Sequence, residues 1–279
     1  MPGTRIDILK SIYEWIDGEE NTCIFWLSGW AGTGKSAIAR TVGRHYHNEG
    51  RLAASFFFSK GGGESSHASM FVTTIAHQLA SNKRLKALGV EQQIRDCLKE
   101  RTQIENETLR DQWDQLVLQP LSRHEEKCGY DAFVLVVDAL DECQQETSVE
   151  TLLRLLPQLG RLANIRMRIL VTSRPETPIR HGFREMQAGA HQGFVLHSIP
   201  SEVSDRDIRV FLQYHLRNIA TMRGLHDDWP GEQATALMVK HAQGLFIWAE
   251  TARRFITKAK NQKSAERRVR LLLEPGSDL

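Results

Sequence analysis

Short apolar runs separated by helical patterns recur along the first 200 residues of the chain. Continuous runs at 24–27, 53–59, 133–138 and 168–175 are typical of strands buried on both faces of a sheet, and 194–200 is expected to be a fifth. The segments between them carry apolar residues at spacings of three and four, which indicates amphipathic helices. This alternation predicts an α/β fold in which a parallel five-stranded sheet is flanked by helices.

The helical segments can be placed from the same periodicity. Apolar positions predict an N-terminal helix over 4–17 that stops at Asp17-Gly18, and Leu-rich or amphipathic helices near 68–81, 90–101, 108–124 and 148–163. After Pro200 the pattern becomes purely helical. A capping-box-like Ser204-Asp205-Arg206-Asp207 opens a helix, 218–230 is expected to be a loop, and helices follow near 231–243 and 246–260. We therefore expect an α/β domain over 1–200 and a small helical lid domain over 201–279.

A glycine-rich loop between the first strand and the next helix carries the strongest chemical signal. Gly29-Trp30-Ala31-Gly32-Thr33-Gly34-Lys35-Ser36 fits the P-loop pattern G-x-x-x-x-G-K-[ST], and Ala37 continues into the helix. Glycines at these positions let successive backbone N–H groups turn towards an anion, to which the helix N-terminus adds its positive end. The order strand, loop, helix favours a nucleotide site over a glycine-rich turn that fits the pattern by accident.

Two side chains of this loop have expected roles. Lys35 is predicted to reach the β- and γ-phosphates, and the Ser36 hydroxyl to ligate Mg²⁺. The whole of 29–37 is therefore expected to bind the nucleotide.

A carboxylate follows the third apolar run. Asp138 ends that strand, at the edge where ligands bind in open α/β sheets, and is predicted to hold Mg²⁺ opposite Ser36. Glu142 is the better candidate to orient or deprotonate the attacking water, while Asp141 could support the metal shell or that base. The alternative is a strand that merely ends in a solvated acidic turn.

Three basic residues and Thr4 complete the set of residues considered for the nucleotide site. Arg174 ends the 168–175 run and is predicted to sense the γ-phosphate, with a structural salt bridge as the alternative. Thr4 and Arg5 precede the P-loop strand and border the nucleotide or form an ordinary capping segment, with equal weight. Lys60, in the loop after the second strand, is more simply a solvated lysine than a phosphate ligand.

Composition and charge argue against several classes of protein. The chain has 279 residues, 41% hydrophobic and 25% charged, with a net charge of +2, which argues against a strongly electrostatic nucleic-acid or membrane partner. There is no apolar run long enough for a membrane helix and no secretory signal, so we expect a cytoplasmic protein. Cys23, Cys97, Cys128 and Cys143 show no metal-ligand spacing and are expected to be reduced thiols.

Three motifs together resemble a known family. GWAGTGKS, LVVDALDE and ILVTSRP, in this order, are similar to the NACHT domain of the signal-transduction NTPases with numerous domains (STAND), in the fungal, nephrocystin-3-like form. MPGTRIDIL, ASFFFSKGGG and GLFIWAETARRF extend the likeness over nearly the whole chain. The resemblance implies a strand order in which the Arg174 strand lies between the P-loop strand and the Asp138 strand.

The resemblance also implies a function. Such proteins hold ADP or GDP at rest, bind ATP or GTP with Mg²⁺, hydrolyse it slowly, and self-associate when a sensor domain is engaged; fungal members act in non-self recognition and programmed cell death. Gly244-Leu245-Phe246 stands where related domains have Gly-x-Pro, which leaves the base preference open. The chain ends at Leu279, without the winged-helix, effector and sensor segments of relatives, so it is expected to be a fragment or a stripped-down member.

Other functions remain open at this stage. The chain could instead be a nucleotide-holding interaction scaffold without turnover, or a conventional P-loop enzyme such as a kinase or a motor ATPase. The acidic pair Asp141-Glu142 suggests water activation and disfavours the kinase.

Overall fold

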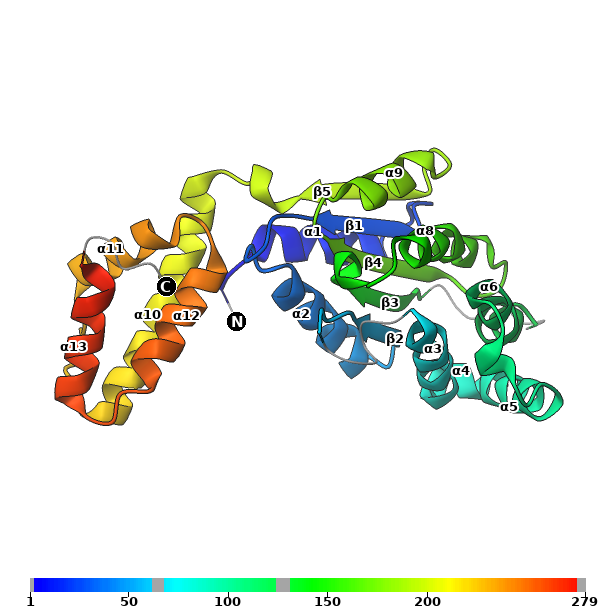
Figure 1. Cartoon of the computed structure of the whole chain (residues 1–279), viewed down its shortest axis with the longest axis horizontal. Helices are drawn as coiled ribbons and strands as arrows, with labels where there is room; N and C mark the ends of the chain where they lie inside the picture. The colour runs from blue at the N-terminus through cyan, green and yellow to red at the C-terminus, as the bar shows by residue number, and fades with distance from the viewer. Residues whose placement is uncertain (1–2, 62–67, 124–130, 275–279) are drawn as a thin grey trace. The chain divides into compact units, whose positions relative to one another are not determined.

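The sheet of this protein is parallel and five-stranded. A computed structural model describes residues 3–61, 68–123 and 131–274. Its strands pair in the order β2-β3-β4-β1-β5 (Figure 1). Their bounds are β1 Ile24–Ser28, β2 Leu52–Phe57, β3 Phe133–Asp138, β4 Met167–Ser173 and β5 His191–Val195. The predicted fold class is confirmed, and so is the strand order, because β4 lies between β1 and β3.

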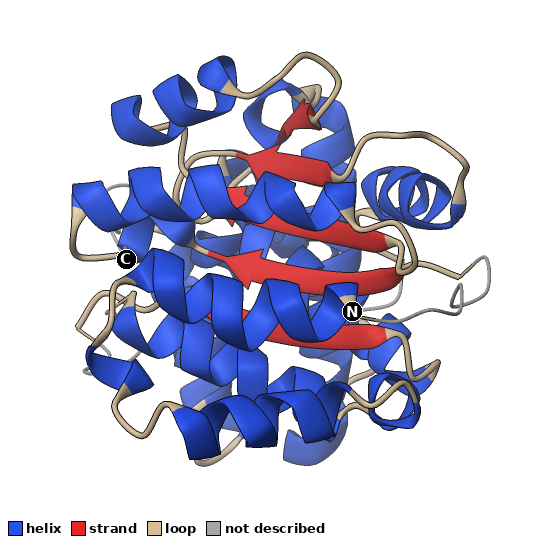
Figure 2. Ribbon diagram, turned by 90° about the vertical axis from the view of Figure 1, so that its right-hand side faces the viewer, coloured by secondary structure: helices blue, strands red, loops and turns tan. Residues whose placement is uncertain are grey.

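Helices cover both faces of the sheet, and Figure 2 shows the strands pointing the same way with helices lying across them. On one face, Trp15 of α1 packs against Phe25, and Gly43 of α2 approaches Val136. The opposite face packs on α3, α8 and α9, as in the stacking of Trp26 on Phe183 with ring centroids 4.3 Å apart. The helices of this part are α1 Ile6–Asp17, α2 Lys35–Asn48, α3 Ser69–Ser81, α4 Lys83–Ala87, α5 Val90–Glu100, α6 Leu109–Trp113, α7 Gln119–Ser122, α8 Glu146–Leu155 and α9 Thr177–Glu185.

Shorter turns link these helices. The segment expected to be one helix over 108–124 is interrupted by a π-helical stretch, Asp114–Leu118, between α6 and α7. The predicted helix over 148–163 is α8 continued by the 3₁₀ segment Leu156–Arg161. The remaining 3₁₀ turns are Ile104–Asn106, Leu140–Glu142 and Leu196–Ser198.

Phe71 lies at the centre of the core between β2 and α3. It is fully buried, and its ring lies 5.3 Å from Phe56 and 6.1 Å from Trp113, centroid to centroid. Phe71→Ala should lower the free energy of unfolding by about 3–5 kcal/mol, because it leaves a cavity in a close-packed site. Denaturant unfolding followed by circular dichroism measures this, with Met70→Ala as control. Met70 is 37% exposed on the same helix, so a comparable loss there would contradict the assignment.

The C-terminal helices form a core of their own. α10 Ser201–Arg223, α11 Glu232–Ala242, α12 Phe246–Thr257 and α13 Gln262–Leu273 pack around apolar residues that include Leu212, Met238 and Ile256. A capping box at Asn261 and Ser264 starts α13. The chain divides into two compact units. One comprises residues 1–7, 30–34 and 196–279, and the other 8–29 and 35–195.

Two element predictions are wrong in position. The fifth strand is His191–Val195 and not 194–200, because Leu196–Ser198 turns into a 3₁₀ segment. α10 begins at Ser201, so Ser204 lies inside the helix, and it continues to Arg223 through part of the expected 218–230 loop. Gly224, with φ +65, ends it in the left-handed conformation.

The described residues contain no helix long and apolar enough to cross a bilayer. Cys23, Cys97 and Cys143 are free thiols, as expected. Cys128, the Gly62-Gly63 part of the loop after β2 and the tail from Pro275 lie outside the described residues.

Candidate functional site

The P-loop leaves β1 after Ser28 and enters α2 at Lys35, so the sequence motif occupies the predicted strand–loop–helix context. Gly32 and Gly34 have φ of +77 and +96. These values lie in a region that other residues rarely adopt, so glycine is required at both positions. The loop therefore has the backbone freedom that a phosphate cradle needs.

Lys35 is held against the start of the loop. Its ammonium Nζ donates to the Gly29 carbonyl oxygen at 2.7 Å, and the residue is only 9% exposed. Burial lowers the pKa of Lys35, while the carboxylates of Asp141, Asp138 and Glu142 act in the opposite direction and Arg174 adds to the lowering. The lysine thus lies within the electrostatic reach of all three predicted acids.

Asp138 ends β3, and Thr172 of the neighbouring strand fixes its carboxylate. The Thr172 hydroxyl donates to Asp138 Oδ1 at 2.6 Å and accepts from the Ala139 backbone N–H at 3.0 Å. Ala139 has a left-handed φ of 55, which begins the turn that carries Asp141 and Glu142. Burial raises the pKa of Asp138, and hydrogen bonds from Thr172 and Ser36 partly offset that rise.

These contacts test whether the predicted Mg²⁺ ligands fit the ion. Ser36 and Asp138 are hydrogen-bonded to each other, so the structure brings the two together. A hydroxyl and a buried carboxylate are hard oxygen donors, which Mg²⁺ prefers, and Mg²⁺ usually completes its shell with water and substrate phosphate. The described residues hold no cluster of three or more His, Cys, Asp or Glu side chains suited to a metal.

Glu142 is held by the loop that follows β2. Its Oε2 accepts the backbone N–H of Lys60 at 2.7 Å. The carboxylate is therefore oriented by a neutral backbone donor and keeps its second oxygen, Oε1, for another partner. Lys60 contributes this amide, while its side chain is exposed.

Arg174 forms an ion pair with Asp141, so a structural salt bridge, the alternative expected for Arg174, is present, with a partner that the sequence did not indicate. Arg174 Nε lies 3.2 Å from Asp141 Oδ2, and its backbone N–H donates to Oδ1 at 2.9 Å. The Asp141 side chain is 5% exposed and the arginine 46%. Asp141 thus orients an arginine that keeps much of its surface in solvent.

Of the remaining predicted residues, Ala37 lies in the same compact unit as Lys35 and Asp138, whereas Thr4, Arg5 and Trp30–Gly34 belong to the unit that contains the C-terminal helices. Trp30–Gly34 cluster there with residues 1–7, among which Thr4 and Arg5 are buried at 8% and 7% exposure. Trp30 is 57% exposed and its ring lies 4.7 Å from His197. Ala31 and Ala37 are exposed.

Two contributors were missed by sequence analysis. Thr172 carries a hydroxyl near the end of the buried run of β4, and a fully buried threonine there is a signal that its hydroxyl has a partner. The Lys60 amide gave no such signal, because every residue except proline supplies a backbone N–H.

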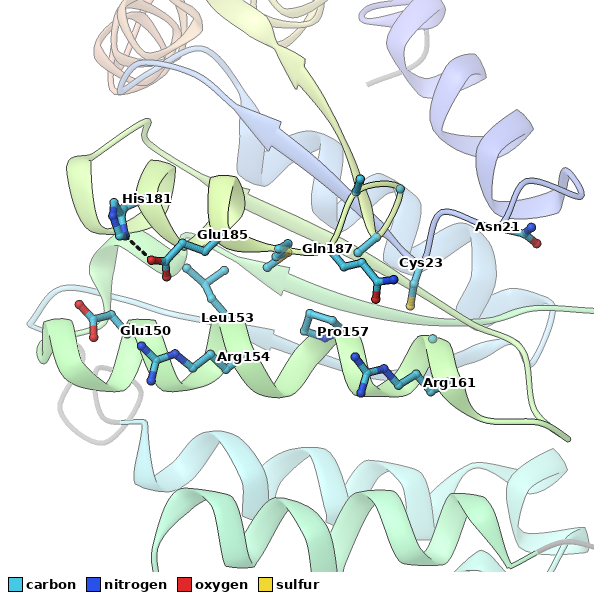
Figure 3. A pocket seen from close by; sticks show the side chains of 16 residues that line it. Asn21, Cys23, Glu150, Leu153, Arg154, Pro157, Arg161, His181, Glu185 and Gln187 are labelled. Carbon is cyan, nitrogen blue, oxygen red and sulfur yellow. Dashed lines mark ion pairs between the residues drawn. The ribbon is translucent and has the colours of Figure 1, made fainter.

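A separate hollow of about 540 Å³ lies where the strands begin, between α8 and α9 (Figure 3). Cys23, Arg154, Arg161 and the paired His181 and Glu185 line it. Cys23 precedes β1, whereas the P-loop follows that strand, so this hollow belongs to the opposite edge of the sheet. Burial raises the pKa of the Cys23 thiol to about 12, so the thiol is not an activated nucleophile.

Comparisons with known proteins agree with this geometry. The family model described as "Nephrocystin 3, N-terminal" matches residues 3–174. The structure of C. elegans PCH-2 is similar with a TM-score of 0.54 at 13% identity, over 97% of this chain and 69% of that one. The structure of Drosophila ORC bound to DNA gives 0.53 at 13% identity, over 98% of this chain and 59% of that one. At such identity the likeness shows the fold alone. No curated protein matches the chain.

Proposed function

The chain belongs to the Nephrocystin 3, N-terminal family, and on this basis we propose that it is a nucleotide-dependent molecular switch that binds ATP or GTP with Mg²⁺ and hydrolyses it slowly. One observation carries the proposal. The P-loop residues Lys35 and Ser36 share one site with Asp138, to which Ser36 is hydrogen-bonded. A phosphate cradle beside a buried carboxylate at the end of a parallel strand is the arrangement that Mg²⁺-nucleotide chemistry requires.

Each residue then has a role. The P-loop N–H groups and Lys35 bind the β- and γ-phosphates, and Ser36 and Asp138 would hold Mg²⁺, which supplies charge neutralisation on the phosphate oxygens. Glu142 orients the attacking water and accepts its proton through the oxygen that Lys60 leaves open. Asp141 holds Arg174, whose guanidinium stabilises charge on the γ-phosphate.

Arg174→Ala should weaken triphosphate binding about tenfold while changing diphosphate affinity little, because only the triphosphate carries the group that the arginine contacts. Calorimetric titration with both nucleotides measures the difference. Arg180→Ala removes an exposed arginine from α9 and controls for net charge. Equal losses for both nucleotides in the Arg174 variant would reduce its role to the Asp141 ion pair.

The biological setting is also part of the proposal. We infer a cytoplasmic signalling role of the kind that fungal NACHT proteins play in non-self recognition and programmed cell death, with self-association on activation and with sensor and effector functions supplied by other segments or partners. The motif resemblance supports this setting.

Two other functions make different predictions. A scaffold would bind nucleotide without turnover, and a motor ATPase would hydrolyse it briskly. Phosphate release at saturating Mg²⁺-nucleotide separates them, with the same nucleotide in buffer without protein as the baseline. Release well below about one per second but above that baseline supports the switch, since P-loop switches are slow without partners. Release equal to the baseline supports the scaffold, and rates typical of ordinary enzymes, about ten per second, support the motor.

A further inference from the structure

Two backbone carbonyl oxygens of the P-loop accept hydrogen bonds from residues outside the loop. The Gly32 carbonyl accepts the Ile247 backbone N–H at 3.2 Å, and the Thr33 carbonyl accepts Arg5 Nη2 at 3.1 Å. These residues all belong to one compact unit. A peptide is planar, and its carbonyl and N–H point in opposite directions. A donor on the Gly32 carbonyl therefore aims the Thr33 N–H, and a donor on the Thr33 carbonyl aims the Gly34 N–H.

Arg5 is anchored to the C-terminal helices. Its backbone N–H donates to Asp207 Oδ2 at 3.0 Å, its Nη1 donates to Ser204 Oγ at 3.4 Å, and its guanidinium carbon lies 4.9 Å from the centre of the Phe246 ring. Asp207 and Ser204 belong to α10 and Phe246 to α12, helices that pack against each other (Figure 1). One buried side chain thus joins the P-loop to two helices.

The backbone conformation of Arg5 also indicates that this residue is held firmly in place. Its φ of 55 lies in the left-handed region, which costs conformational energy for a residue other than glycine. The surrounding hydrogen bonds hold it there. Burial lowers the pKa of the guanidinium, and the Asp207 carboxylate acts against that lowering.

The start of α12 depends on the loop. Ile247 is the second residue of this helix, which has no side-chain cap, so its N–H would lack an acceptor without the Gly32 carbonyl. The packing is close, because a Cβ placed on Gly32 would lie 2.4 Å from Ile247 Cγ2. The P-loop therefore replaces the missing N-cap of α12.

We propose that Arg5 is a positioning residue of the nucleotide site, which fixes the P-loop peptides from their carbonyl side and couples nucleotide binding to the first turn of α12. This inference rests on the proposed function. Because coupling between two events is reciprocal, nucleotide that orders the loop must also stabilise the Ile247 hydrogen bond.

The test measures nucleotide affinity and amide exchange on the same chains. Arg5→Ala should weaken ATP and ADP, or GTP and GDP, by the same factor of about ten, because it acts on the loop N–H groups and not on the γ-phosphate. Bound nucleotide should slow hydrogen exchange of the Ile247 amide in the parent chain, and this slowing should be lost in the variant. Arg5→Lys keeps the charge beside Asp207 but loses the forked donors of the guanidinium. Its nucleotide affinity should therefore lie between those of the parent and Arg5→Ala, and it should remain folded.

Arg209→Ala is the matched control. Arg209 is an arginine of α10 that pairs with Glu232 of α11. Its loss should leave both affinity and Ile247 protection unchanged. Parent-like affinity in the Arg5 variants, or an equal loss in Arg209→Ala, would overturn the positioning role while the proposed function stands. If the parent binds no nucleotide, the proposed function fails. In that case the structural role of Arg5 is tested by hydrogen exchange without nucleotide. The Ile247 amide must exchange faster in Arg5→Ala than in the parent, and equal rates would show that Arg5 does not hold the loop.

Discussion

Lys35→Ala is expected to weaken Mg²⁺-nucleotide binding by roughly a hundredfold or more, since it removes a charge-assisted contact to two phosphates. The lysine is 9% exposed and already hydrogen-bonded to the Gly29 carbonyl, so little ordering is needed when phosphate arrives. Burial lowers its pKa, but the surrounding carboxylates favour the charged form. Titration calorimetry with ATP, ADP, GTP and GDP measures the loss.

Lys10→Ala is the control for this variant, because Lys10 is a lysine of α1 with 71% of its side chain exposed. It should bind as the parent does. Melting temperatures of both variants without nucleotide show whether the fold is retained. A Lys35→Ala chain that is folded and binds with unchanged affinity would contradict the assignment of the P-loop as the phosphate site.

Glu142→Gln should leave nucleotide affinity within about threefold of the parent and slow phosphate release about 10²- to 10⁴-fold, the range that a general base contributes. Glutamine keeps an oxygen that can accept the Lys60 N–H, so the loop contact survives while the basic carboxylate is lost. The rate is measured as phosphate release at saturating Mg²⁺-nucleotide, beside a binding titration of the same sample.

Glu146→Gln supplies the comparison, since Glu146 is an exposed glutamate in the first turn of α8. It should hydrolyse at the parent rate. A Glu142→Gln chain that loses binding and turnover in parallel would show that Glu142 is structural, and unchanged turnover would move the role of base to Asp141.

Much of the site could be predicted because its signals are local. The P-loop, and Asp138 at the end of an apolar run, each follow from a few consecutive residues, and the strand order then brings them together. A structural salt bridge of Arg174 was foreseen as one of two alternatives, but its partner Asp141 was not, because residues 33 positions apart leave no local pattern.

The least predictable features depend on backbone groups. The Lys60 N–H donates to Glu142, and the Gly32 and Thr33 carbonyls accept from Ile247 and Arg5. Every residue has a backbone carbonyl and every residue except proline a backbone N–H, so the sequence does not indicate these contacts. The predicted ends of some strands and helices are wrong for a related reason. At 194–200 the apolar pattern continues past the end of the strand, and only the 3₁₀ turn at Leu196–Ser198 ends it.

The most direct test is a titration of the purified chain with ATP, ADP, GTP and GDP, each with Mg²⁺, beside Lys35→Ala. A switch should bind at least one diphosphate tightly, with a dissociation constant of about 1 µM or below, and the Lys35 variant should lose that binding. The preferred base would then be identified as well. If the folded parent chain binds none of the four nucleotides, the site does not hold nucleotide and the proposed function is wrong.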